Sequence, residues 1–343
     1  MPIARLRNIL FGLFAFGIGG TAQAQAPADF YKGQTVTLIL SSAPGGGYDA
    51  IARTLAVHLP KHIPGNPTVV VKNMAGAGGI VAANFLYNVA PKDGLTIGGL
   101  QNNVPFEPLF GTKEANFDPT KFHWLGTPSM ETAILTIWSE TSDVKTLEQA
   151  RTTELTMGSS GNNSTPSFYG RLFNEVLGTK LKIIVGYQSQ THAFLAMERG
   201  EINGYPSVFY NSLMATKPDW FKDGKVRLLV QLGYKEPAIA DVPSVADVVT
   251  NEADKRLIEA AAAPLTAGRP YLMPPGVPAD RVAAMRKAFE ETFKDPEFIA
   301  DGNKRGLGIN APRNGQALQE LIERVYKDTA PEQVERLRLL QKG

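Results

Sequence analysis

Residues 35–59 decide the fold, and they read TVTLILSSAPGGGYDAIARTLAVHL. The first part is an apolar, β-branched run that predicts a buried strand over Thr35–Leu40. The three glycines at 45–47 predict a tight turn, and a helix is expected from Asp49 onward. Its apolar side chains recur along one helix face: Ile51, Leu55 and Leu59. A strand that leads through a glycine turn into a helix is the first part of a βαβ unit.

The same succession of strand, turn and helix recurs along the chain. Further apolar runs predict strands over these ranges: 68–71, 95–98, 155–157, 182–185, 201–205 and 226–231. Glycine-rich turns at 76–79 and 158–165 each lead into a helical pattern, and two long helices are expected over 279–293 and 316–340. This alternation indicates an α/β fold with doubly wound, largely parallel sheets. The chain is longer than one core usually allows, so two lobes are expected.

The first residues have the pattern of a secretory signal. Basic residues precede the apolar run Ile9–Ile18, and small residues follow at Ala22 and Ala24 with the spacing that a signal peptidase reads. We expect a signal peptide over residues 1–24, with a cut after Ala26 as the other position that the pattern allows. The run is too short to span a bilayer, which needs about 20 apolar residues, so no membrane anchor is expected.

The composition excludes several classes of function. Removal of the leader leaves 33 basic and 33 acidic residues, a balance that does not favour nucleic acid or an anionic membrane as a partner. The chain has no cysteine, which rules out thiolate metal sites, disulfide chemistry and a cysteine nucleophile. The mature protein is therefore expected to be held together by burial of its core alone.

The turn at 45–47 places backbone N–H groups at the positive end of a helix dipole, which is the geometry of an anion site. Two other interpretations stay open. Residues 45–50 also fit the dinucleotide fingerprint G-x-G-x-x-A, but Val71-Lys72-Asn73 stands where that fingerprint expects an acidic residue. The third interpretation is that the glycines serve only a tight turn.

The polar turn at 158–165 is a second candidate anion site, with Ser and Asn side chains beside the N–H groups of a helix start. A nucleophile elbow, G-x-S-x-G, requires glycine at position 162, where this chain has Asn162. A hydrolase is therefore disfavoured, while a purely capping role for these hydroxyls stays open.

A pair of histidines has the spacing of metal ligands. His58 and His62 are separated by four positions, as two ligands on one helix face would be. Pro60 stands between them and no glutamate follows His58, so the H-E-x-x-H pattern fails. We expect a frayed helix end here, and no metal site.

Several segments resemble the periplasmic receptors of tripartite tricarboxylate transporters, also called the Bug family. The matching segments follow one another in this order: 43–53, 69–73 with 76–79, 90–96, 158–161, 240–244 and 273–278. Together they extend over about residues 28–343. The resemblance implies a Venus-flytrap fold with two crossings between the lobes. By this analogy, lobe 1 takes residues 28–130 and 264–343, and lobe 2 takes residues 131–263.

The resemblance also implies a ligand site between the lobes. Family members hold a carboxylate through backbone N–H groups and ordered waters of the first turn, and polar groups of the second lobe close over it. Carried onto this chain, the expected ligand-binding residues are Gly45, Gly46, Gly47, Tyr48, Gly78, Gly79, Asn102, Asn103, Ser159, Ser160, Gly161, Ser164, Thr165, Tyr187, Tyr205 and Ser207. No catalytic residue, metal or cofactor is expected.

Three segments near the expected cleft depart from the family pattern. Members have a Ser-Pro-Gln-His type start to the helix of lobe 2, where this chain has Ser164-Thr165-Pro166-Ser167. The usual Tyr-Lys-Gly turn reads Tyr187-Gln188-Ser189, and Ser42-Ala43 replaces a bulky residue before Pro-Gly-Gly. These departures leave the identity of the carboxylate open.

The expected function is that of a periplasmic receptor that captures a small organic anion, by the resemblance a carboxylate, and delivers it to inner-membrane permease subunits. It is expected to act as a monomer, without enzymatic activity. Two alternatives stay open. A sensor module would present its liganded form to a membrane signalling partner, and a secreted hydrolase or oxidoreductase would turn its ligand over.

Overall fold

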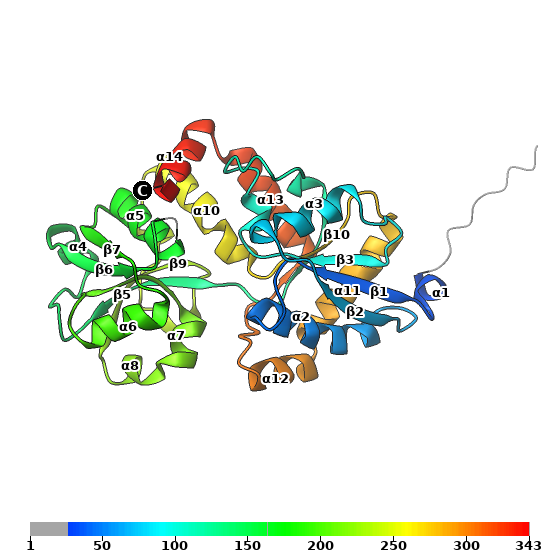
Figure 1. The fold of residues 1–343 in the computed structure, drawn as a ribbon, viewed down its shortest axis with the longest axis horizontal. Helices are drawn as coiled ribbons and strands as arrows, with labels where there is room; N and C mark the ends of the chain where they lie inside the picture. The colour runs from blue at the N-terminus through cyan, green and yellow to red at the C-terminus, as the bar shows by residue number, and fades with distance from the viewer. Residues whose placement is uncertain (1–26, 163, 343) are drawn as a thin grey trace, which may run out of the picture.

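The computed structural model describes residues 27–162 and 164–342. It consists of two α/β lobes placed side by side, each built around one β-sheet with helices on both faces (Figure 1). The two-lobed α/β fold expected from the sequence is therefore confirmed. The expected signal peptide, over residues 1–24 or 1–26, lies outside the described residues. Within the described ranges, no helix has both the length and the apolar character needed to cross a membrane.

The first lobe has a six-stranded sheet with the strand order β11-β4-β10-β3-β1-β2. Its strands are β1 (Thr35–Leu40), β2 (Thr68–Asn73), β3 (Thr96–Gly99), β4 (His123–Thr127), β10 (Tyr271–Met273) and β11 (Arg313–Asn314). Its helices are α1 (Pro27–Tyr31), α2 (Gly47–His58), α3 (Ile80–Asn88), α11 (Ala279–Lys294), α12 (Pro296–Lys304) and α13 (Gly315–Asp328). Short 3₁₀ turns are η1 (Leu59–His62), η2 (Ala77–Gly79), η3 (Val104–Phe106) and η4 (Pro119–Lys121).

The second lobe has a five-stranded sheet with the strand order β7-β6-β8-β5-β9. Its strands are β5 (Thr132–Trp138), β6 (Leu155–Ser159), β7 (Leu181–Val185), β8 (Gly204–Phe209) and β9 (Val226–Gly233). Its helices are α4 (Leu147–Thr152), α5 (Thr165–Leu177), α6 (Gln190–Glu198), α7 (Tyr210–Thr216), α8 (Pro218–Lys222) and α9 (Val245–Val248), with a 3₁₀ turn η5 (Pro237–Ile239). The turn at 158–165 thus joins β6 to α5, as the sequence predicts.

The expectation of largely parallel sheets is wrong, because both sheets are mixed. Strand β1 pairs in parallel with β2 and β3, and β6 pairs in parallel with β7 and β8. Strand β10 runs antiparallel to both of its neighbours, and so does β5. Each of these two strands enters its sheet from the other lobe. It therefore starts at the edge where the strands of the βαβ units end, and it must run in the opposite direction.

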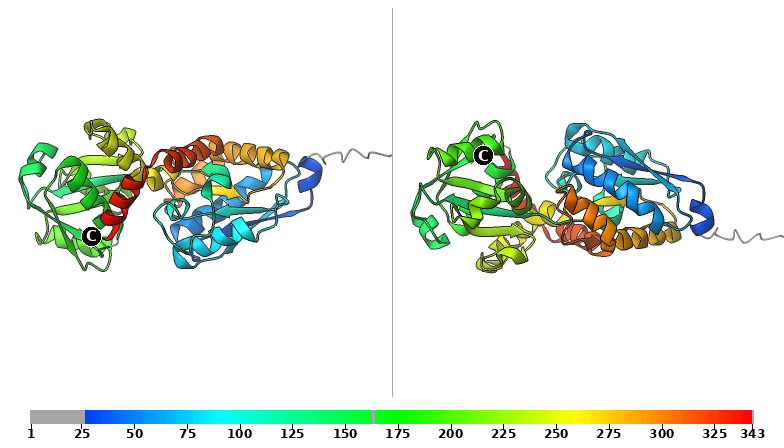
Figure 2. Two further views of the ribbon diagram at one scale, coloured as in Figure 1. Left: turned by 90° about the horizontal axis from the view of Figure 1, so that it is seen from above. Right: turned by 90° about the horizontal axis from the view of Figure 1, so that it is seen from below.

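The chain passes between the two sheets at two places. The first crossing leads directly from β4 to β5, and the second leads from β9 back to β10 through the helix α10 (Glu252–Ala267). The helix α14 (Pro331–Lys342) then packs on α5 and α10 instead of on the first sheet. Both views of Figure 2 place this last segment, coloured red, at the junction of the lobes. The lobe boundaries at 130/131 and 263/264 stay a prediction.

Three clusters of buried apolar side chains form the core. Two clusters are confined to one lobe each, around Phe289 in the first lobe and Trp220 in the second. The largest cluster runs through both lobes, because α10, α13 and α14 contribute Leu257, Leu321 and Leu340 beside strands of both sheets. The lobes are therefore in continuous contact on the side of α10, α13 and α14. This contact fixes where a cavity can form between them.

Candidate ligand-binding site

A cavity of about 460 Å³ lies between the two lobes. Its volume is in the range that proteins use for small-molecule ligands. Its polar wall residues are Tyr48, Gln101, Asn102, Asn103, Glu107, Thr165 and Gln341. Its apolar and aromatic wall residues are Phe110, Phe168, Tyr169, Phe209, Ala261, Pro264, Leu265 and Leu337. The wall therefore comes from both lobes, from the crossing helix α10 and from the C-terminal helix α14.

The polar end of the cavity is organised by Tyr48, which lies in the first turn of α2. Its hydroxyl oxygen accepts a hydrogen bond from the backbone N–H of Asn102, at 3.1 Å, in the turn after β3. Burial raises the pKa of the Tyr48 hydroxyl, so the group stays protonated at neutral pH. Because the oxygen accepts from Asn102, the hydroxyl proton is available to donate to a ligand.

The turn before α2 has the conformation of an anion site. Gly45 has φ of +86°, and Gly46 is the N-cap residue of α2 in an extended conformation. The first N–H groups of a helix have no partner inside the helix, which leaves those of Gly47 and Tyr48 for a ligand. All three glycines of the turn are exposed. This geometry suits both an anion site and a tight turn, so the binding of an anion here stays a prediction.

A buried carboxylate, that of Asp49, holds this turn in place. Its Oδ2 accepts from the N–H of Gly45, at 3.0 Å, and from Nε of Arg53, at 2.9 Å. Its Oδ1 accepts from Nδ2 of Asn73, at 2.9 Å. The hydrogen bond from Arg53, helped by those from Gly45 and Asn73, lowers the pKa of Asp49 to about 2 despite its burial. One N–H of the predicted anion site is thus taken by the protein itself.

A cation that the sequence motifs do not reveal lies next to this turn. Nη2 of Arg269 is 4.0 Å from the position that a Cβ on Gly47 would take. The guanidinium lies 5.7 Å from the centre of the Tyr48 ring, and its Nη2 is 3.5 Å from Oε1 of Glu131. Arg269 stands between α10 and β10, at one of the two crossings between the lobes. The residue is remote from the turn in sequence, so only the fold brings them together.

The serines of the second turn form a cluster among themselves. The hydroxyl of Ser159 lies 2.7 Å from that of Ser164 and 2.7 Å from that of Ser167. The hydroxyls of Ser164 and Ser167 both donate to the carbonyl oxygen of Gly161, each at 2.7 Å. Ser159 and Ser167 are fully buried. These three hydroxyls therefore shape the turn between β6 and α5, but the Ser164 side chain does not cap the helix, since it accepts no hydrogen bond from the first N–H groups of α5.

The family model described as "Tripartite tricarboxylate transporter family receptor" (TctC) matches residues 51–332. The chain belongs to this receptor family. The receptor is 28% identical over 239 residues to the "UPF0065 protein in gbd 5'region" of Cupriavidus necator, and the alignment covers 66% of this chain and 67% of that protein. Membership of this family makes the protein a solute-binding receptor and not an enzyme.

Solved structures show the same fold. The receptor is similar to a TctC solute-binding protein from Polaromonas without ligand, at 20% identity and a TM-score of 0.71, with 90% of this chain and 98% of that chain covered. It is also similar to MatC from Rhodopseudomonas palustris with bound malate, at 19% identity, a TM-score of 0.55 and coverages of 90% and 99%. A second R. palustris protein, with adipate, has 19% identity, a TM-score of 0.56 and coverages of 89% and 97%.

Only some of the predicted ligand-binding residues lie in the cavity wall. Four of them line it: Tyr48, Asn102, Asn103 and Thr165. Gly45, Gly46 and Gly47 lie beside its polar end, while Ser160 and Gly161 lie in the turn that precedes Thr165. The wall residues that the sequence did not suggest include Phe110, Phe168 and Phe209, because an aromatic side chain is usually a core residue and no local pattern marks one that faces a cavity.

Other predicted residues lie away from this wall. Tyr205 is buried in the core of the second lobe, with its ring 5.7 Å from that of Phe194, and burial raises its pKa to about 12. Ser207 is also buried, and its hydroxyl has no hydrogen-bond partner among the described residues. Tyr187 packs beside the same core cluster. The part that these three side chains play in ligand binding stays a prediction.

The turn with Gly78 and Gly79 has a structural explanation. Both residues have positive φ, +64° and +103°. A Cβ on Gly79 would lie 2.7 Å from Cγ2 of Val104 in η3. Glycine therefore lets the start of α3 approach η3, whose preceding turn carries Asn102 and Asn103. This contact positions the polar end of the cavity whether or not the glycines touch the ligand.

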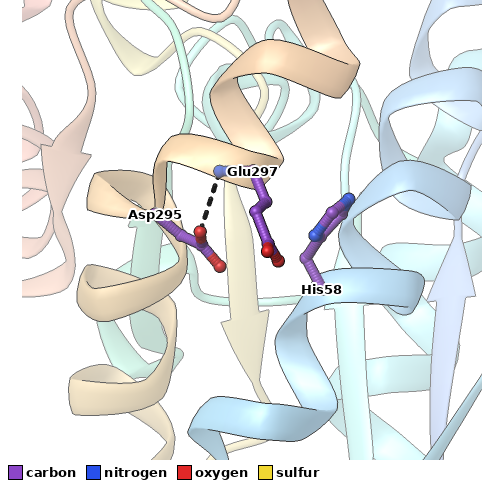
Figure 3. A group of neighbouring side chains, drawn as sticks. All are labelled: His58, Asp295 and Glu297. Atoms are coloured by element: carbon purple, nitrogen blue, oxygen red, sulfur yellow. Dashed lines mark hydrogen bonds between the residues drawn. The ribbon is translucent and has the colours of Figure 1, made fainter.

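The histidine pair lies elsewhere, where α2 and η1 meet α11 and α12. The side-chain ligand atoms of His58, Asp295 and Glu297 lie within 4.8 Å of one another (Figure 3). The Nζ atom of Lys61 is 2.6 Å from a carboxylate oxygen of Asp295 and 2.6 Å from one of Glu297. One ammonium group therefore already pairs with both carboxylates. As predicted, α2 ends at His58 and a 3₁₀ turn follows.

Proposed function

We propose that the receptor binds an organic carboxylate between its lobes and delivers it to the inner-membrane permease subunits of a tripartite tricarboxylate transporter. The observation that carries this proposal is the polar end of the interlobe cavity. There Tyr48 lines the wall, the start of α2 adjoins it, and the Arg269 guanidinium lies 5.7 Å from the centre of the Tyr48 ring. The malate and adipate in two structures of the same fold support a carboxylate as the ligand.

In this proposal the ligand carboxylate accepts hydrogen bonds from the N–H groups of Gly47 and Tyr48 at the positive end of α2. The Tyr48 hydroxyl donates a further hydrogen bond, and Arg269, which also pairs with Glu131, adds a charged donor beside the ligand. Closure of the second lobe, residues 131–263, onto the first lobe, residues 28–130 and 264–343, brings Thr165 over the ligand. Closure also expels water, which strengthens each of these electrostatic interactions.

The first experiment is a thermal-shift screen of the mature protein, from Gln25 onward, against organic acids, inorganic phosphate, sugars and nucleotides. An acid present at 100 times its Kd should stabilise the folded protein by about 2.7 kcal/mol. The proposal is wrong if compounds of the other classes stabilise the protein and no carboxylate does.

The second experiment tests the polar end of the cavity by replacing its cation. Arg269→Gln should weaken the best acid of the screen by about tenfold to a hundredfold, because a hydrogen bond to a charged group is worth about 1.5–3 kcal/mol. Arg269→Lys should retain part of the affinity, since it keeps the charge but loses the planar fork. Arg199→Gln is the matched control, because Arg199 is exposed on the second lobe. Titration calorimetry showing equal affinities for Arg269→Gln and wild type would contradict this role.

Delivery to a permease is tested in membranes. Mature receptor with its acid should restore uptake of that acid into proteoliposomes that contain the candidate permease subunits, and receptor without them should not. The liganded receptor should also enrich permease subunits from solubilised membranes. Enrichment of a signalling protein in their place would favour a sensor.

Mass spectrometry of the periplasmic protein should find a mature N-terminus at Gln25 or Pro27.

A further inference from the structure

The wall of the interlobe cavity combines many apolar side chains with one charged group, Glu107, and this composition restricts the ligand. We propose that the receptor selects a monocarboxylate with an apolar or aromatic body and discriminates against acids that carry a second carboxylate at the far end. This inference rests on the proposed function, since it names the kind of acid that the same cavity takes. It departs from the dicarboxylates, malate and adipate, found in two structures of the same fold.

The groups proposed to bind the carboxylate lie around Tyr48. Tyr48 belongs to the cavity wall, the start of α2 adjoins it in the chain, and Arg269 stands beside its ring. Thr165 and Gln341 add uncharged donors to the wall. No lysine or arginine belongs to the cavity wall itself, as far as the described part of the chain goes. A single carboxylate is therefore matched, whereas a second one deeper in the cavity would be removed from water without a cation to balance it.

The rest of the wall is suited to an apolar body. Phe110 comes from the first lobe, Phe168 from α5, and Phe209 from the end of β8, so that aromatic rings face the cavity from both lobes. Each of the three is only partly buried and packs on the edge of the core cluster that runs through both lobes. Leu337 of α14 and Leu265 of α10 extend this surface. Contact with a hydrocarbon or aryl group would remove these remaining apolar surfaces from water.

One wall residue acts directly against a second carboxylate. Glu107 holds its side chain in the wall through two hydrogen bonds, from Nδ2 of Asn103 at 2.8 Å and from Oγ1 of Thr112 at 2.6 Å. Both of its oxygens are therefore fixed in place. A carboxylate of the ligand brought close to Glu107 would meet a like charge in a partly dehydrated site. The cavity thus combines a site for one carboxylate at Tyr48 with a fixed negative charge in its wall.

The test compares acids that differ at one position. Hexanoate and adipate have the same carbon chain and differ only in a terminal methyl or carboxylate, and benzoate and terephthalate form an aromatic pair. We expect titration calorimetry of the mature receptor to give at least tenfold tighter binding for the monocarboxylate of at least one pair. Equal or tighter binding of adipate and terephthalate would overturn the inference and leave the proposed function intact. Binding of no acid at all would instead defeat the proposed function.

Glu107 could instead pair with an ammonium group of the ligand. Phenylacetate and L-phenylalanine distinguish this role of Glu107 from repulsion of a second carboxylate. The two compounds share the phenyl and carboxylate groups, and only L-phenylalanine carries an ammonium group. Phenylacetate should bind at least as tightly as L-phenylalanine. Binding of L-phenylalanine alone would show that Glu107 receives an amine, and it would overturn the inference.

Two variants test the wall itself. Glu107→Gln should narrow the difference in Kd between hexanoate and adipate by at least threefold, because it removes the like charge and retains the hydrogen-bonding shape. Phe168→Ala should weaken hexanoate by at least threefold, whereas Phe221→Ala, on an exposed residue of α8, should not. The melting temperature without ligand reports whether each variant folds. An unchanged hexanoate-to-adipate ratio in folded Glu107→Gln would contradict the proposal, whatever the fate of Phe168→Ala.

Discussion

At the scale of single residues, the site depends on charges whose partners are set by the fold. Asp49 is buried at the start of α2, where an acidic side chain would compete with a ligand anion for the same N–H groups. Its bonds to Arg53 and Asn73 direct it toward the protein, and only the N–H of Gly45 is taken. Asp49 therefore stabilises the turn by hydrogen bonds and leaves the N–H groups of Gly47 and Tyr48 to a ligand.

Asp49 gives the receptor a stability that depends on pH. Its pKa is lowered from 3.8 to about 2 in the folded protein, so its contribution is complete above about pH 4 and is lost as the pH falls toward 2. Asp49→Asn should therefore cost about 1–3 kcal/mol in the free energy of unfolding at neutral pH. Urea unfolding should show that the difference between this variant and wild type shrinks from pH 4 to pH 2.

The matched control for Asp49 is Asp143→Asn, because Asp143 is exposed in a loop of the second lobe. Its unfolding free energy should stay within about 0.5 kcal/mol of wild type at every pH. If Asp49→Asn behaves like this control, the network around Asp49 does not hold the turn.

At the scale of elements, local patterns located the strands of the βαβ units and several helices that follow them, but missed β4, β5, β10 and β11 and the crossing helix α10. Strand β1 is where the sequence predicts it, over Thr35–Leu40. The helix expected over 316–340 is two helices, since Pro331 cannot continue α13 and instead begins α14. The strand expected over 201–205 is shifted to β8, because apolar residues continue through Val208 on the buried side.

The serine cluster between β6 and α5 holds the turn that joins these two elements, and its contribution to stability can be measured. Ser167→Ala should lower the free energy of unfolding by about 1–3 kcal/mol, since it leaves the buried Ser159 hydroxyl and the Gly161 carbonyl short of a partner. Thermal and urea unfolding measure this change. Ser160→Ala, on an exposed residue, is the control and should be close to neutral. A neutral Ser167→Ala that loses acid binding would mean that these hydroxyls contact the ligand instead.

At the scale of the whole molecule, α14 ties the lobes together next to the cavity. Nε of Arg171 on α5 donates to the carbonyl oxygen of Leu340, at 2.7 Å, and Nε of Arg338 donates to that of Phe110 in the first lobe, at 2.8 Å. Leu337 of the same helix belongs to the core cluster that runs through both lobes, and it also lines the cavity. The C-terminal helix therefore contributes to the stability of the fold and to the ligand-binding wall together.

Two leucines of α14 provide a matched pair of variants. Leu337 is 1% exposed and Leu339 is 60% exposed. Leu337→Ala should lower the free energy of unfolding by about 2–5 kcal/mol, because it opens a cavity in the core. Leu339→Ala should change it by less than about 0.5 kcal/mol. Equal effects in urea unfolding would show that α14 does not pack on the core in solution.

The sequence by itself determined the features that depend on neighbouring residues. The order of strands and helices, the turn before α2 and the stop of α5 follow from side-chain periodicity and from the backbone freedom of glycine. The tertiary structure alone decided which distant residues meet. It brought Arg269 beside Gly47 and placed Phe110, Phe168 and Phe209 around one cavity. The physical reason is that these contacts depend on how the sheets and the two lobes pack on a shared core, and a pattern of neighbouring residues does not encode that packing.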